Sequence, residues 1–165
     1  MKRFTLCLSL LVAGLAAVAP AWAADSAFCA DLKAVVSDSA NHFDSFRGAQ
    51  FGNVERDSVN DVTTKYTTSK TLTGAADCWI EDFMGPEDDK PLRSYNCEWT
   101  PAGSKADTVK TVGQAVEDCI GGDPMDSLDV NDDGSAEAYV YGNGYKVNVG
   151  SGDAPNIRFT IYDEH

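Results

Sequence analysis

The sequence has few basic residues, 13 Lys and Arg against 26 Asp and Glu among 165 residues, and the basic residues do not cluster. Phosphate binding needs clustered Lys and Arg, so this scarcity argues against a nucleic-acid-binding protein. With two histidines and no C-x-x-C pair, the chain also lacks the usual ligands of a zinc site and the motif of a thioredoxin-like protein.

Residues suited to catalysis are scarce as well, because no glycine-flanked nucleophile elbow occurs in the sequence. His42 could act as a base for a serine, but it stands beside Phe43 in a predicted helix, which favours a structural histidine. Glu81 and Asp82 are neighbours in a predicted strand and point to opposite faces, so they do not form an acid and base pair. We predict that the protein has no catalytic residues and is not an enzyme.

Apart from its first residues, the chain has no apolar run approaching the ~20 residues of a membrane-spanning helix. Two cations and the apolar residues 4–19 precede a proline and a small-x-small pattern that ends at Ala23, which is typical of a secretory signal peptide. We therefore expect a signal peptide at residues 1–23, a single domain at residues 24–165, and a periplasmic or secreted location without a membrane span.

Cleavage at this position would leave 11 basic and 26 acidic residues, a net charge of −15. A basic protein surface or a cation is the partner that such a charge favours. The alternative is that the charge only keeps an exported protein in solution.

Four cysteines remain after cleavage, and an even number in an exported chain predicts two disulfides with three connectivities. Cys78 and Cys97 are equidistant from the centre of a predicted turn between residues 87 and 88, so they are expected to face each other across a hairpin. Cys29 and Cys119 would meet if the two predicted helices are antiparallel. We predict these two pairs, and the other connectivities stay open because bonds between adjacent strands need favourable geometry.

Two amphipathic helices are predicted from apolar residues at helical spacing. The first begins at Asp25 or Ser26 and ends at Gly48, and the second is capped by Asp107 and ends at Gly121. Three strands are expected after each helix, at residues 62–72, 78–83, 93–99, 138–142, 145–149 and 157–162.

The dipeptide Asn143-Gly144 is a type I′ hairpin signal that would set Val140 against Val147 and Ala138 against Val149. The expected fold is α+β, an antiparallel sheet of about six strands with two helices packed on one face. The repeated order of helix and three strands is compatible with an internal duplication, although no residue-level repeat is visible.

Residues 129–137, DVNDDGSAE, carry oxygen at alternate positions, as a loop that wraps calcium requires. Gly134 stands at the sixth place of an EF-hand-type loop, where a sharp turn is needed, but Val140 stands at the twelfth in place of the bidentate Glu. Eight acidic residues and no basic one lie between Lys110 and Lys146, and a divalent ion would relieve their repulsion. The predicted calcium ligands are Asp129, Asn131, Asp133, Ser135 and Glu137.

The segment DVNDDGSAEAYVYG resembles the calcium loops of FG-GAP repeats in integrin-like propellers, where Asp-x-Asn-x-Asp-Gly-x-x-Asp leads directly into an apolar strand. The resemblance covers about fourteen residues in one copy, whereas a propeller needs many blades. It implies the loop chemistry alone, and Glu137 stands where those repeats usually have Asp. The alternative is an acidic turn whose Asp and Asn side chains cap their own backbone.

Trp79 and Trp99 are predicted to lie in or beside the first hairpin, where exposed aromatic rings would form a binding surface. The leading hypothesis is a small exported non-enzymatic binding protein, an inhibitor or immunity-type module that acts on a basic protein partner. The alternatives are a calcium-stabilised structural protein of the cell envelope and an uncharacterised hydrolase.

Overall fold

The computed structural model describes residues 26–57, 59–101, 103–121, 126–130, 135–150 and 156–163, with residues 126–130 described by their backbone alone. The predicted signal peptide, residues 1–23, lies outside this description. One antiparallel sheet has the strand order β1-β2-β3-β4-β8-β7-β6-β5. The elements are α1 (Ser26–Asp38), a 3-10 helix η1 (Ser39–Asn41), β1 (Arg47–Arg56), β2 (Val62–Thr68), β3 (Asp77–Met84), β4 (Leu92–Trp99), α2 (Lys105–Ile120), β5 (Asp126–Val130), β6 (Ala136–Gly142), β7 (Tyr145–Gly150) and β8 (Ile157–Asp163).

The structure confirms the α+β class with two helices, two disulfides and an antiparallel sheet, whereas the predicted count of six strands is wrong. The sheet has eight strands, seven of them with described side chains. The sequence analysis missed β1 and β5. Nine of the ten β1 residues are exposed, because the strand lies at the edge of the sheet, so it shows no apolar alternation.

The first helix is shorter than predicted, because it ends at Asp38 and not at Gly48. The amide and hydroxyl of Ser45 both donate to the Asp38 carboxylate, at 3.2 and 2.7 Å, which supports a turn. His42 and Phe43 therefore lie in this turn with φ of 54° and 57°, and not on a helix as expected. Phe43 is still buried in the core, which explains why its position fitted the apolar spacing of a helix in the sequence.

The second helix begins with a different cap from the one predicted. The Ser104 hydroxyl accepts the amide of Asp107 at 3.1 Å, so Ser104 is the N-cap and Asp107 lies in the first turn. The helix ends as predicted at Gly121, whose φ is 64° and whose amide donates to the carbonyl of Glu117 at 2.9 Å.

The predicted pairing across the last hairpin is confirmed, with Val140 opposite Val147 and Ala138 opposite Val149. Gly144 has the positive φ of 79° that its turn requires. Asn143 does not have a positive φ, so the turn is not of type I′.

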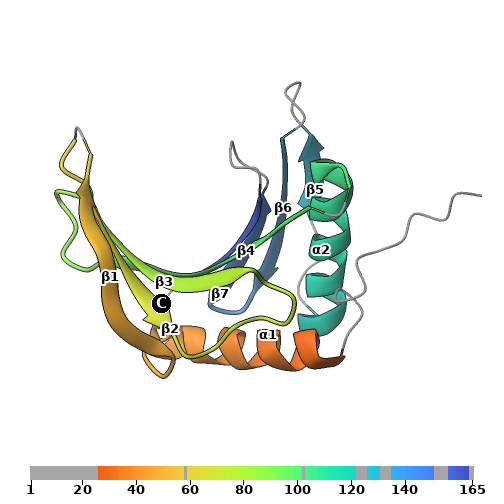
Figure 1. The fold of residues 1–165 in the computed structure, drawn as a ribbon, viewed down its shortest axis with the longest axis horizontal. Helices are drawn as coiled ribbons and strands as arrows, with labels where there is room; N and C mark the ends of the chain where they lie inside the picture. Colours follow the sequence, from red (N-terminus) through yellow and green to blue (C-terminus); the bar gives the residue numbers. More distant parts are fainter. Residues whose placement is uncertain are drawn as a thin grey trace, which may run out of the picture.

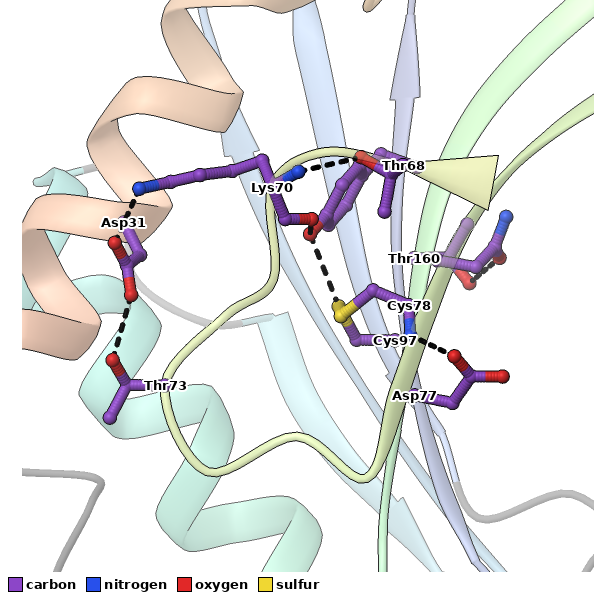
Figure 2. The surroundings of a disulfide bond; sticks show 10 residues. Asp31, Thr68, Lys70, Thr73, Asp77, Cys78, Cys97 and Thr160 are labelled. Atoms are coloured by element: carbon purple, nitrogen blue, oxygen red, sulfur yellow. Dashed lines mark hydrogen bonds and ion pairs between the residues drawn. A yellow bond between two sulfur atoms is a disulfide. The ribbon is translucent and has the colours of Figure 1, made fainter. Parts of the chain in front are cut away.

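Both predicted disulfides are present in the structure. Cys29 of α1 joins Cys119 of α2 with a Cα–Cα distance of 5.1 Å, and Cys78 joins Cys97 directly across β3 and β4 at 4.1 Å. Figure 2 shows the second bond and the nearby connection between α1 and the β2–β3 loop. In that connection the hydroxyl of Thr73 donates to the carboxylate of Asp31 at 2.7 Å.

The core lies between the helices and one face of the sheet, and Figure 1 shows α1 and α2 on the convex side of the curved strands. Trp99 of β4 lies at its centre, with ring centroids 6.5 Å from Phe28 of α1 and 5.8 Å from Phe159 of β8. The helices contribute Phe28, Leu32, Val35, Val109, Val112, Ala115, Val116 and the Cys29–Cys119 disulfide to this single cluster.

The two halves of the sheet have the same arrangement of strands. β4 and β8 lie side by side at the middle, and in each half the earlier strands of the chain follow in order toward the edge. Each half consists of one α-helix followed by four strands. The duplicated arrangement suggested by the sequence therefore has units of four strands and not three. Since both helices lie on the convex side, the concave side of both halves forms one continuous surface (Figure 1).

Candidate binding face of the sheet

The face opposite the core, called the open face here, carries neither of the two described helices (Figure 1). Strand register defines it, because one row of paired residues runs from Trp79 through Asn96, Thr160 and Asn148 to Tyr139 across five strands. Side chains two positions away along each strand lie on the same face. Its described members are Phe51, Glu55, Thr63, Lys65, Thr67, Asp77, Trp79, Glu81, Phe83, Leu92, Ser94, Asn96, Glu98, Glu137, Tyr139, Tyr141, Lys146, Asn148, Arg158, Thr160 and Tyr162.

The centre of the open face is built from small polar side chains that satisfy one another. The Asn96 amide donates to the Ser94 hydroxyl, and the Thr160 hydroxyl donates to the Asn96 carbonyl oxygen, both at 2.9 Å. All three residues are buried although no helix covers them. The middle of this surface is therefore polar and already hydrogen-bonded.

Tyrosines of β6 and β8 surround a lysine at one flank of this face. The Lys146 ammonium lies 4.4 Å from the ring centroid of Tyr139, 5.8 Å from that of Tyr141 and 5.9 Å from that of Tyr162. The Tyr139 hydroxyl donates to the Glu137 carboxylate at 2.9 Å.

The hydroxyls of Tyr139 and Tyr162 stay protonated at neutral pH, because the pKa of each is raised. Burial and the contact with Glu137 raise the pKa of Tyr139. Burial and the charges of Glu81 and Glu137 raise the pKa of Tyr162. The Tyr139 hydroxyl donates its proton to Glu137, and the protonated Tyr162 hydroxyl is a hydrogen-bond donor as well.

Most of the exposed large hydrophobic side chains in the described residues lie on the open face, where Phe83 and Leu92 are direct partners. The described part of the chain has six of them, and four belong to this face: Phe51, Phe83, Leu92 and Tyr141, with exposed fractions of 36% to 47%. The other two are Val54 in β1 and Val59 in the following turn. Scattered exposed apolar residues are ordinary, but a group on one face indicates an interaction surface.

Carboxylates border this apolar group at the turns after β1 and β3. Partial desolvation together with the charges of Asp57 and Asp88 raises the pKa of Asp61, which indicates that these three residues repel one another. Two cations of the open face are already paired, Lys65 with Glu55 at 3.3 Å and Arg158 with Glu98 at 3.2 Å. The border therefore presents negative charge beside apolar side chains.

The two tryptophans predicted to bind lie on opposite faces. Trp99 is only 1% exposed in the core, so the prediction that it forms a binding surface is wrong. Trp79 is on the open face, but the residue is only 7% exposed. Its indole N–H donates to Glu81 at 3.2 Å, and the Arg158 guanidinium lies 5.3 Å from its ring centroid. The accessible apolar residues of the open face are Phe51, Phe83, Leu92 and Tyr141, and strand pairing is what places them on this face.

The predicted calcium ligands lie only partly within the described residues. Asn131 and Asp133 are outside them, Asp129 is placed by its backbone in β5 opposite Glu137, and Ser135 directly precedes β6. The loop therefore follows a strand and not a helix. Within the described ranges no group of three or more His, Cys, Asp and Glu side chains could hold a metal ion. Calcium binding stays a prediction.

His42 contacts the carboxylate of Asp163 through its Nδ1 atom, and its own side chain is half exposed. The nearby Arg93 donates to the carbonyl of His42 at 3.3 Å and to the carboxylates of Asp44 at 2.9 Å and Asp82 at 2.6 Å. These contacts join the turn after α1 to β3, β4 and β8. They give His42 a structural role.

Comparison with family models, with curated proteins and with solved structures found no match for this chain. Neither described α-helix is long and apolar enough to cross a membrane.

Proposed function

We propose that this protein is a small exported binding protein without enzymatic activity, which docks a basic protein partner on the open face. An inhibitor or immunity-type module works in this way. The observation that carries the proposal is that four exposed large apolar side chains, Phe51, Phe83, Leu92 and Tyr141, share a sheet face that neither described α-helix covers (Figure 1). Such a group desolvates on contact with a partner and supplies the apolar centre of an interface.

Charge supports a basic partner. The acidic border formed by Asp57, Asp61 and Asp88 adjoins the apolar group, and the whole sequence carries a net charge of −13. Complementary charges at the border of an interface accelerate association and exclude acidic proteins. The two disulfides are typical of proteins that work outside the reducing cytosol, which supports a periplasmic or secreted location.

Capture from the envelope fraction or culture medium of the source cells tests this function. The wild-type protein is expected to retain a basic protein in stoichiometric amount, and Phe83→Asp is expected to lose it. Ala30→Asp is the matched control, because Ala30 is exposed on α1, on the opposite side of the sheet, and receives the same charge. Equal capture by both variants, or capture only of acidic proteins, would contradict the proposal.

We also propose that calcium binds the loop from Asp129 to Glu137 and stabilises it. The antiparallel register supports this, because it brings the backbones of Asp129 and Glu137 opposite each other at the two ends of the loop. A structural role of calcium is compatible with partner binding on the open face.

A further inference from the structure

Lys146 is held in an unusual environment for a cation of this acidic chain. It lies in β7 between Tyr141 of β6 and Tyr162 of β8, which are its direct partners across the sheet. No ion pair joins Lys146 to a carboxylate within the described ranges, whereas Lys65 and Arg158 on the same face are paired. The lysine is also partly buried.

The tyrosine rings stabilise the charge of the ammonium but do not supply strong acceptors for its hydrogen bonds. A cation over an aromatic face gains electrostatic attraction, but the ring offers no strong acceptor to the three N–H groups of a lysine. The tyrosines therefore fix the position of Lys146 and leave its hydrogen-bonding capacity for another group. An anionic acceptor is the group that gives the strongest hydrogen bonds to an ammonium.

A pocket of about 250 Å³ opens beside this lysine and is lined by Leu92, Lys146, Tyr162 and Asp163. It combines a cation, a tyrosine hydroxyl that is protonated at neutral pH and an apolar side chain that is 47% exposed. The Asp163 carboxylate contacts the His42 ring nitrogen. A few polar groups converging on an apolar wall are characteristic of a site for a small ligand.

We propose that this pocket binds an organic carboxylate with a short apolar chain. The carboxylate accepts hydrogen bonds from the Lys146 ammonium and the Tyr162 hydroxyl, and the chain packs on Leu92. This site goes beyond the docking of a basic protein, because a small ligand occupies it without a protein partner.

Sodium hexanoate is the probe, titrated into the ¹⁵N-labelled protein at constant ionic strength while amide shifts are recorded by NMR. We expect saturable shifts at Leu92, Lys146 and Tyr162, with a dissociation constant on the order of millimolar for so small a ligand. Hexan-1-ol and hexylammonium chloride have the same chain without the carboxylate, and they are expected to bind at least about tenfold more weakly.

Lys146→Met keeps the apolar stem of the side chain and removes its charge, so it is expected to weaken hexanoate at least about tenfold. Lys110→Met is the matched control, because Lys110 is exposed on α2 and its loss should leave the affinity unchanged. The dispersion of the amide spectrum confirms that both variants are folded. Hexanol that binds as tightly as hexanoate, full affinity in Lys146→Met, or no saturable shift would each overturn the proposal.

The carboxylate can belong to a free small molecule or to the C-terminus of a polypeptide. N-acetyl-leucyl-leucine and its C-terminal amide distinguish these sources. Tighter binding of the dipeptide acid than of hexanoate, and none of the amide, assigns a polypeptide terminus. Binding of hexanoate alone assigns a free carboxylate.

Discussion

Phe83 and Leu92 face each other across the β3–β4 hairpin, and both side chains are more than a third exposed. Ile80, three residues before Phe83, is on the core face and fully buried. Strand β3 therefore presents one apolar side chain, Phe83, to solvent and another, Ile80, to the core. This contrast separates the residues that we propose for partner binding from those that pack in the core.

Phe83→Asp is expected to change the free energy of unfolding by no more than about 1 kcal/mol, because the side chain is exposed in a strand. Ile80→Ala is expected to cost roughly 2–5 kcal/mol through lost burial and a cavity. Denaturant unfolding of both variants measures this. A cost for Phe83→Asp as large as that of Ile80→Ala would show that Phe83 belongs to the core.

Removal of the Cys29–Cys119 bond by two Ala substitutions is expected to destabilise the protein more than removal of Cys78–Cys97. The bonds span 90 and 19 residues of chain. Loop-closure entropy alone predicts losses of roughly 4.5 and 3 kcal/mol respectively. Guanidinium unfolding of the two double variants gives the order, and the reverse order would contradict the entropic account.

Asp31 makes stability depend on pH in the acid range. Burial alone would raise the pKa of Asp31, but hydrogen bonds from Lys70 and Thr73 and the Lys70 charge lower it below the ordinary value of 3.8. A lowered folded pKa adds stability above the unfolded value, and this stability is lost as pH falls through the folded pKa.

The advantage of the wild type over Asp31→Asn is therefore expected to be constant above about pH 5 and to shrink below it. Urea unfolding of both proteins at a series of pH values measures the difference. An advantage that is equal at pH 7 and at pH 2.5 would show that Asp31 does not titrate in this way.

The calcium loop is expected to bind weakly, with a dissociation constant on the order of 10⁻⁴ to 10⁻³ M, because the bidentate acid at the twelfth place is missing. Calcium at ten times this concentration should add roughly 1.4 kcal/mol to the free energy of unfolding and raise the melting temperature by several degrees. Magnesium should do less.

Asp133→Ala is expected to abolish the calcium effect without lowering the melting temperature of the calcium-free protein, because it removes one carboxylate from a crowded loop. Calorimetric titration and thermal unfolding at millimolar calcium provide the measurements. Neither heat nor a thermal shift would mean that residues 129–137 form only a turn.

Local spacing predicted much of the fold. The equal distances of Cys78 and Cys97 from a turn identified their disulfide, and a glycine-containing turn fixed the register of Val140 with Val147. Phe28 and Leu32 repeat with the period of a helix and are both buried in α1. These features depend on residues that are close in sequence.

The candidate site could not be predicted in the same way, because it depends on which strands become neighbours. Lys146 and Tyr162 are paired only because β7 joins β8, and Phe83 is exposed only because the helices occupy the other face. An edge strand such as β1 has no buried side, so it shows no apolar periodicity. Apolar periodicity in a sequence indicates which residues are buried. Exposed apolar residues such as Phe83 do not follow that periodicity, so the sequence alone does not single them out.

Hydroxyl-radical footprinting of the captured complex tests the central claim most directly, because side-chain oxidation reports solvent access to individual residues. We expect Phe51, Phe83, Leu92 and Tyr141 to be oxidised in the free protein and protected in the complex. The exposed side chains of α2, on the opposite side of the sheet, should react equally in both. Unchanged oxidation of the four open-face residues, with protection of α2, would contradict the account.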